Sequence, residues 1–82
     1  MIEYEHKLLE TQLKSFAAKN FVRPSDCRNI AQVKFYLREL CSNIEHYEQQ
    51  FDYVPSWAYT LLSQYNLVQN KMISTKYRLA YR

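Results

Sequence analysis

A chain of 82 residues has room for one domain, and its 48% hydrophobic and 23% charged residues are ordinary for a globular protein, which argues against disorder. The absence of glycine disfavours folds rich in β-hairpins, because their tight turns need residues with positive φ. The net charge is +3, and no apolar run approaches the roughly 18 residues that a membrane span needs. The first residues, MIEYEHK, carry acids where a signal peptide carries bases, so we expect a soluble cytoplasmic protein.

The first of three predicted helices covers residues 2–19. Long segments without glycine, interrupted by only two prolines, favour helices, and we expect residues 1–82 to form a single all-α domain. Asn20 tolerates the left-handed conformation of a helix end better than most residues do. The apolar face of this helix is formed by Ile2, Leu9, Leu13 and Phe16.

The central helix is predicted over residues 26–51 by the strongest pattern in the chain. Its apolar residues recur at alternating spacings of three and four, which places them on one helical seam. Ser25 or Asp26 is expected to cap its start, and Pro24 prevents the first helix from running through. The seam consists of Ile30, Val33, Leu37, Leu40, Ile44, Tyr47 and Phe51.

The last helix is predicted over residues 55–80, with Pro55 at its first position, where its missing N–H would be unpaired anyway. Residues 52–54 are then a short link, and short links join antiparallel neighbours, so the fold should be dominated by a long helical hairpin. The apolar seam again alternates by three and four. It consists of Ala58, Leu61, Tyr65, Val68, Met72, Thr75 and Leu79.

The relative lengths of the helices predict an uncovered hairpin tip. The first helix should pack antiparallel to the central one, starting from the end near residues 20–26. Because it is shorter, it should end about 12 Å before the tip of the hairpin. The aromatic side chains at the tip would then lack a third helix to cover them.

No motif of catalysis or cofactor binding is present. The chain has no glycine-rich phosphate loop, no nucleophile elbow and no pair of histidines at i and i+4. A Cys2His2 zinc site from Cys27, Cys41, His6 and His46 lacks the closely spaced ligand pairs of known zinc sites. We therefore expect no enzyme, no cofactor, no metal site and no small-molecule substrate.

The two cysteines are expected to remain reduced. If both lie on one helix they are about 21 Å apart, whereas a disulfide needs Cα atoms within roughly 7 Å. Cys41 adjoins the central seam and is predicted to be in the core. Cys27 is predicted in a helical first turn, where the helix dipole can lower a thiol pKa, although a partly buried, inert thiol is the simpler interpretation.

Positive charge is concentrated in the last third of the chain. All eight acids and seven bases lie in residues 1–52, for a charge of −1, whereas residues 53–82 carry four bases and no acid, for +4. Basic residues interleaved with tyrosines suit a nucleic-acid backbone and stacked bases, although cations also complement the dipole at a helix C-terminus. The candidates for nucleic-acid binding are Lys71, Lys76, Arg78, Tyr81 and Arg82.

Aromatic residues gather at the predicted hairpin tip, in the stretch FDYVPSWAY. Tyrosine and tryptophan are enriched at protein interfaces, but a small bundle also uses aromatics to close its end. We predict a non-enzymatic protein–protein interaction module, such as an adaptor, co-chaperone or inhibitor, that self-associates as a homodimer. The alternative is a nucleic-acid-binding accessory or regulatory protein. The candidate partner-binding residues are Tyr47, Phe51, Tyr53, Trp57 and Tyr59.

Overall fold

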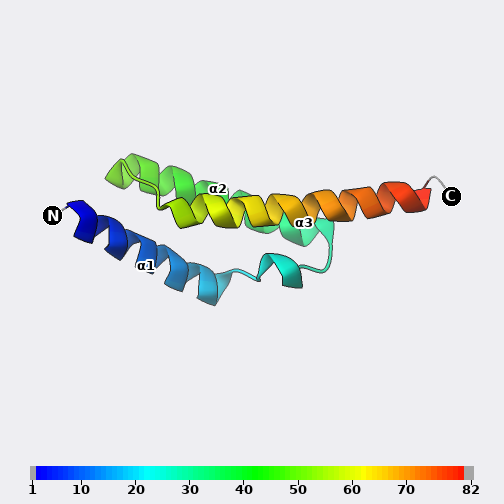
Figure 1. Ribbon diagram of the computed structural model, residues 1–82, viewed down its shortest axis with the longest axis horizontal. Helices are drawn as coiled ribbons and strands as arrows, with labels where there is room; N and C mark the ends of the chain where they lie inside the picture. The colour runs from blue at the N-terminus through cyan, green and yellow to red at the C-terminus, as the bar shows by residue number, and fades with distance from the viewer. Residues whose placement is uncertain (1, 81–82) are drawn as a thin grey trace.

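The computed structural model describes the backbone of residues 2–80 and the side chains of residues 4–75. Figure 1 shows an elongated arrangement of helices, with principal extents of 58, 21 and 16 Å. No strand occurs within residues 2–80, so the predicted all-α fold of three helices is confirmed. No helix in this part of the chain combines the length and the apolar character that a membrane crossing requires. The elements are α1 (Ile2–Asn20), the short 3-10 helix η1 (Pro24–Asp26), α2 (Ile30–Phe51) and α3 (Ser56–Ala80).

The α2–α3 hairpin holds most of the core, and its two apolar seams meet as the periodicity predicts (Figure 1). Side chains that are fully buried here stabilise the fold by about 1.5–3 kcal/mol each. Phe51, the last member of the α2 seam, is 49% exposed, because α2 ends there and the chain turns at Asp52. α1 lies mainly against α3. The buried members of the two seams are Val33, Leu40, Ala58, Leu61 and Tyr65.

The start of α2 differs from the prediction. The helix begins at Ile30 rather than at residue 26, and its N-cap is Asn29 rather than Ser25 or Asp26. Asn29 Oδ1 accepts a hydrogen bond of 2.8 Å from the backbone N–H of Gln32, which satisfies one of the unpaired donors of the first turn. Pro24–Asp26 instead form η1, and an extended segment separates η1 from α2.

The link between the two long helices turns at Asp52, whose φ of 51° and ψ of 34° lie in the left-handed region that Asp adopts more readily than most residues. Its N–H donates to the carbonyl of Glu48 at 3.0 Å and ends α2. The carbonyl of the buried Pro55 accepts from the N–H of Ala58 at 3.0 Å. Pro55 therefore occupies the capping position, and α3 begins one residue later than predicted, at Ser56.

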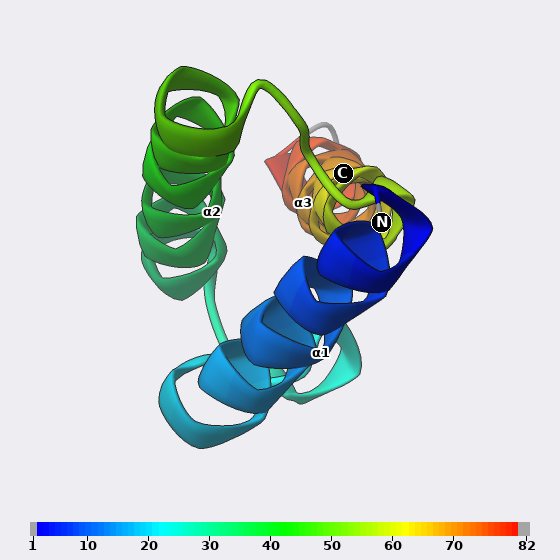
Figure 2. The same cartoon turned by 90° about the vertical axis from the view of Figure 1, so that its left-hand side faces the viewer.

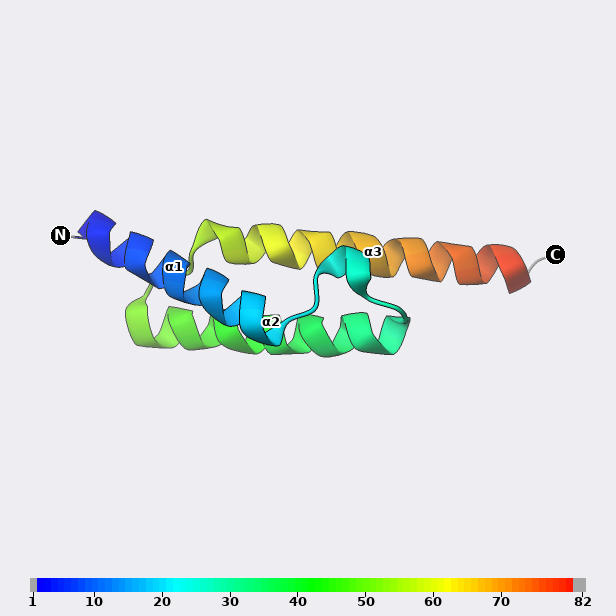
Figure 3. The ribbon, with the colours of Figure 1, turned by 90° about the horizontal axis from the view of Figure 1, so that it is seen from below.

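The prediction that α1 ends before the hairpin tip is wrong. The N-terminal end of α1 reaches past the tip in both Figure 1 and Figure 3. α1 ends at Asn20, one residue past the predicted end at residue 19. The physical reason for its position is the connection that follows, because η1 and its flanking residues run along α3 before α2 begins. This connection shifts α1 toward the tip, where the ring of His6 stacks on Tyr53 with centroids 3.6 Å apart.

Tyr65 on α3 anchors the segment between α1 and η1 to the hairpin. Its side chain is 0% exposed, and its hydroxyl donates a hydrogen bond to the carbonyl of Val22, between α1 and η1. Phe21 and Tyr36 lie beside it, with ring centroids 6.5 and 5.9 Å from that of Tyr65. Burial, with smaller contributions from Cys27 and Tyr36, raises the pKa of Tyr65 to about 12. The hydroxyl therefore stays neutral and remains a donor at physiological pH.

Replacing Tyr65 with Phe should lower the free energy of unfolding by about 1–2 kcal/mol, because the carbonyl of Val22 loses its donor in a partly buried site. Urea denaturation followed by circular dichroism measures this loss. Tyr4, which is 70% exposed, supplies the matched control, and Tyr4→Phe should leave the midpoint unchanged. Equal stability of Tyr65→Phe and the wild type would contradict a structural role for the bond.

The pH dependence of the same pair provides a second check. The folded-state pKa of Tyr65, about 12, lies above the ordinary value of 10.0. The neutral hydroxyl therefore makes its full contribution to the stability of the fold below pH 10, and this contribution is lost as the pH rises toward 12. The Tyr65→Phe protein should therefore lose less stability between pH 10 and pH 12 than the wild type does.

Candidate functional site

A groove of about 640 Å³ opens between α1, η1 and α3. It exists because α1 crosses α3 at an angle, so that its C-terminal half diverges from α3 (Figures 1 and 2). The lining is mostly apolar. We refer to it as the α1–α3 groove, and its apolar lining includes Ala17, Ala18, Phe21, Pro24, Trp57 and Leu67.

The α3 wall of the groove is a stripe that shares Leu61 and Val68 with the hairpin seam and extends to one side of it. Its residues recur at spacings of four, three and four, so they share one helical face. The stripe is Trp57, Leu61, Gln64 and Val68. Leu61 is buried against the core, whereas Trp57 is half-buried and packs its inner side on the core. Leu67, at the edge of the stripe, is 57% exposed, so the rim of the groove leaves a large apolar side chain in solvent.

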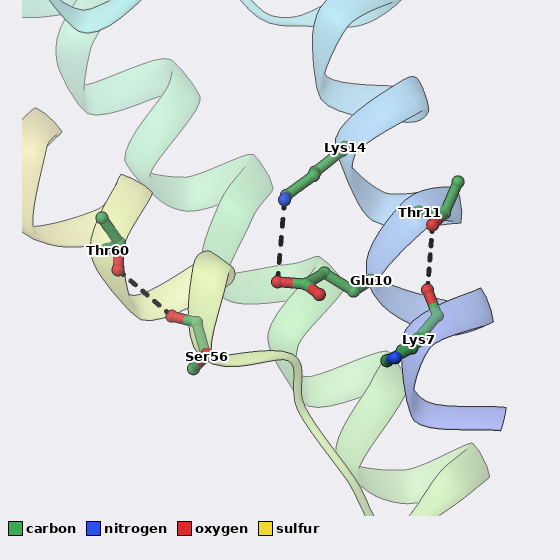
Figure 4. A network of polar contacts seen from close by, with 6 residues as sticks. All are labelled: Lys7, Glu10, Thr11, Lys14, Ser56 and Thr60. Atoms are coloured by element: carbon green, nitrogen blue, oxygen red, sulfur yellow. Dashed lines mark hydrogen bonds and ion pairs between the residues drawn. The ribbon is translucent and has the colours of Figure 1, made fainter. Parts of the chain in front are cut away.

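Two cations border the groove. Lys14 and Arg23 are both exposed, and no acid is found among the described residues that line the groove. Lys14 points from α1 toward the first turns of α3 (Figure 4), where its Nζ lies 6.0 Å from the centroid of the Trp57 ring. The same Nζ lies 3.8 Å from Oε1 of Glu10, an ion pair between partly exposed side chains that contributes little to stability.

The aromatic residues predicted as a single tip surface are divided among four places. Tyr47 and Phe51 lie together on α2, with ring centroids 5.7 Å apart. Tyr53 is stacked against His6, and Trp57 belongs to the α1–α3 groove. Tyr59 is 49% exposed and lies two residues from Trp57, which places it on nearly the opposite face of α3.

The predicted basic face is described only in part. Lys71 is exposed and shares a hollow of about 420 Å³ with Arg28, which precedes α2. Asn29, Ile30, Met72 and Thr75 complete the lining, so no acid occurs among the described residues around it. The other candidates fall outside the described part: the side chains of Lys76 and Arg78, and the whole of Tyr81 and Arg82.

The prediction of a core position for Cys41 is wrong, whereas the simpler interpretation of Cys27 as a buried, inert thiol agrees with the structure. Cys41, expected in the core, is exposed, because it lies on the side of α2 that no helix covers. Cys27 is buried, at 8% exposure, in the extended segment after η1 rather than in a helical turn. Its Sγ donates to the carbonyl of Arg23 at 3.6 Å. Burial and the charge of Asp26 raise the pKa of this thiol above its ordinary value, the opposite of activation by a helix dipole.

The hypothetical zinc ligands do not assemble. Within the described side chains, no group of three or more His, Cys, Asp or Glu residues is close enough together to hold a metal ion. His6 stacks on Tyr53 at the tip, and Cys27 is buried in the core.

Comparisons of this chain with protein-family models, curated proteins and solved structures find no match.

The sequence did not predict the α1–α3 groove. Among the residues of its lining, only Trp57 was predicted to bind a partner, and Trp57 was assigned to the tip. Two signals were present: the spacing of Lys14, Ala17 and Phe21, and the spacing of Trp57 and Gln64 on the flank of the α3 seam. Each pattern is too short to be distinguished from the flank of a core face. The groove depends on the crossing of two helices that are far apart in the sequence.

The two thiols should differ in reactivity. We expect Cys41 to react with a thiol-specific disulfide reagent at pH 8 at least about ten times faster than Cys27, because thiolate character and access both favour the exposed site. Stopped-flow absorbance measures both rates, and the Cys41→Ser and Cys27→Ser proteins assign the two phases. Denaturant should bring the rates together. Fast labelling of Cys27 in folded Cys41→Ser would contradict the buried position.

Proposed function

We propose that this chain is a non-enzymatic protein-interaction module that holds a segment of a partner protein in the α1–α3 groove. The observation that carries the proposal is an open, mainly apolar groove of about 640 Å³ with a half-buried tryptophan on its wall and an exposed leucine on its rim. Tryptophan is the residue type most enriched at the energetic centres of interfaces. A partner segment bound in this groove would remove the exposed parts of Trp57 and Leu67 from water, which favours association.

The character of the groove favours a protein ligand over a small molecule. Sites for small molecules converge a few polar groups on the ligand from an enclosed wall. In this groove the hydroxyl of Tyr65 is already engaged by Val22, and the charged groups of Lys14 and Arg23 stand at the exposed border. An apolar floor with a charged rim is the usual organisation of a protein–protein interface.

Exposed aromatic residues outside the α1–α3 groove offer separate positions for the self-association predicted from the sequence. Phe51 on α2 and Tyr59 on α3 are each 49% exposed, and Tyr47 packs beside Phe51. We propose that a homodimer uses these aromatic residues, which leaves the α1–α3 groove free for another protein. An adaptor, a co-chaperone and an inhibitor all fit this arrangement.

A pair of substitutions on α3 distinguishes the groove from the tip. Leu67→Lys places a charge on the groove rim and should weaken binding of a partner isolated from the native host by about tenfold or more, or about 1.4 kcal/mol. Tyr59→Lys makes the same change on nearly the opposite face and should alter the affinity less than about twofold. Both sites are exposed helix positions, so both proteins should keep their helical circular dichroism.

The measurement is calorimetry or fluorescence with the purified partner and the full chain. Loss of binding in Tyr59→Lys with retention in Leu67→Lys would assign the partner to the tip and refute the groove. Light scattering of the same two proteins shows which face mediates any self-association.

Nucleic-acid binding is the second candidate function, supported by the hollow that Arg28 and Lys71 share without a nearby described acid. Residues 53–82 carry four bases and no acid, so this part of the sequence has a charge of +4. Phosphate contacts made by such a surface release counterions, so the affinity would depend steeply on salt.

If this candidate is right, binding of a fluorescent single-stranded oligonucleotide should weaken on the order of tenfold or more between 50 and 200 mM salt. Lys71→Ala should reduce the slope of the logarithmic salt dependence by about one. Lys34→Ala, which removes an exposed charge from α2, is the matched control and should leave the slope nearly unchanged. Anisotropy titrations measure all three proteins, and an absence of binding at 50 mM salt would rule out this function.

A further inference from the structure

We infer that the occupant of the α1–α3 groove is an amphipathic helix of a partner protein, with acidic residues on the flanks of its apolar stripe. The inference rests on the proposed function, because it names the chemistry of the segment held in that groove. It follows from the shape of the two walls and from the charge at their borders.

The walls of the groove are two helix faces. On α1, Lys14, Ala17 and the adjoining Phe21 recur at spacings of three and four, and on α3 the stripe from Trp57 to Val68 repeats the same periodicity. Two such faces present ridges and grooves that a third helix can match with apolar residues at i, i+3 or i+4, and i+7. A helix laid between them would stand beside α1 and α3 as the fourth helix of a bundle.

The size of the groove sets the length of the helix. From Trp57 to Val68 the α3 wall spans about 16 Å at 1.5 Å per residue, which corresponds to three helical turns in the partner. Ala18 on the opposite wall is exposed and has a short side chain, so the partner backbone can approach α1 closely there. The half-buried Trp57 at one end provides the large flat surface on which a partner leucine or phenylalanine would pack.

Charge complementarity selects acidic flanks. Lys14 and Arg23 border the groove, and no described lining residue is an acid. Lys14 is engaged by Glu10 only through an ion pair of 3.8 Å between partly exposed side chains, so its charge remains available to a partner. A helix with Asp or Glu beside its apolar stripe would pair with both cations, whereas a basic helix would meet like charges at both.

Trp57 makes the inference directly measurable. It is the single tryptophan of the chain and lies on the wall of the groove, so its fluorescence reports occupancy. The probes are three synthetic 16-residue helical peptides without tryptophan that share one leucine stripe at spacings of three and four. Their flanking positions are glutamate, glutamine or lysine.

With the full chain at 50 mM salt, the glutamate peptide should bind about fivefold or more tightly than the glutamine peptide, and the lysine peptide should bind more weakly than both. At 500 mM salt the three affinities should converge, because screening removes the charge contribution while the apolar contact remains. Leu67→Lys should abolish the Trp57 response to the glutamine peptide.

Charge substitutions supply the matched controls. The double substitution Lys14→Gln and Arg23→Gln should remove the preference for glutamate flanks while keeping the affinity for the glutamine peptide. Lys34→Gln with Arg38→Gln neutralises two exposed cations on α2, outside the groove, and should leave the preference intact. Circular dichroism of each protein confirms that the fold is unchanged.

Other results would overturn the inference. Equal binding of all three peptides, lost in Leu67→Lys, would refute the acidic flanks but leave the proposed protein-binding groove in place. If the fluorescence of Trp57 responds to none of the peptides, a helical occupant is refuted. The proposed function would then be tested separately, by the affinity of the Leu67→Lys protein for the native partner.

Two results would assign the groove to a different occupant. A change in Trp57 fluorescence that depends on protein concentration and matches a monomer–dimer equilibrium would assign the groove to a second copy of this chain. Displacement of the glutamate peptide by a single-stranded oligonucleotide would assign it to nucleic acid.

Discussion

The hydrogen bond from the buried hydroxyl of Tyr65 to the carbonyl of Val22 is the interaction on which the arrangement of the three helices depends. The hairpin of α2 and α3 is held by two long apolar seams, and the core that they form also includes Ala17 of α1 and Cys27. α1 buries fewer side chains than either seam, namely Leu13 and Ala17. Its position is therefore also set by the connection to η1, which Tyr65 ties to the middle of α3. Leaving this partly buried carbonyl without a donor would cost free energy, which favours the observed position of Val22.

The α1–α3 groove is a consequence of this anchoring. Because residues 21–29 run along α3, α1 joins the hairpin part-way along its length and then crosses toward the tip (Figure 3). Near the tip it contacts the hairpin through the stack of His6 on Tyr53. At its other end the backbone of α1 diverges from that of α3, although Ala17 and Phe21 still reach the core. The space between is lined by side chains of α1, η1 and α3 but filled by none of them. A chain this short has no further element in its described part to close the space.

The same geometry separates the two kinds of exposed apolar residue. Trp57 and Leu67 face a concave surface with cations at its border, which suits an inserted partner segment. Phe51 and Tyr59 lie on convex helix surfaces at and near the tip, which suit a flatter contact such as a dimer. Cys41 also lies on the open side of α2, whereas Cys27 is enclosed between η1 and the hairpin. The proposed functions therefore use different faces of one small bundle.

The amino-acid sequence by itself determined the helices and the hairpin. Seven apolar residues at alternating spacings of three and four predict α2 and its buried face, and a second seam with Pro55 before it predicts α3 to within one residue. These features are local, because helical periodicity and the restrictions of proline act within a few residues of the chain. The start of α2 was less predictable, since Ser25, Asp26 and Asn29 are all good caps and the choice among them depends on where η1 packs.

Only the tertiary structure decided the site. No periodicity in residues 2–19 indicates that α1 lies mainly against α3 rather than α2, or that His6 reaches Tyr53. Those contacts follow from a hydrogen bond between residues 43 positions apart and from the length taken up by η1. Trp57 could be recognised from the sequence as a candidate binding residue, but its surroundings could not, because they come from three segments brought together by the crossing of α1 over α3. Local chemistry determined which helices form, and the packing of one connection determined which surface they leave open.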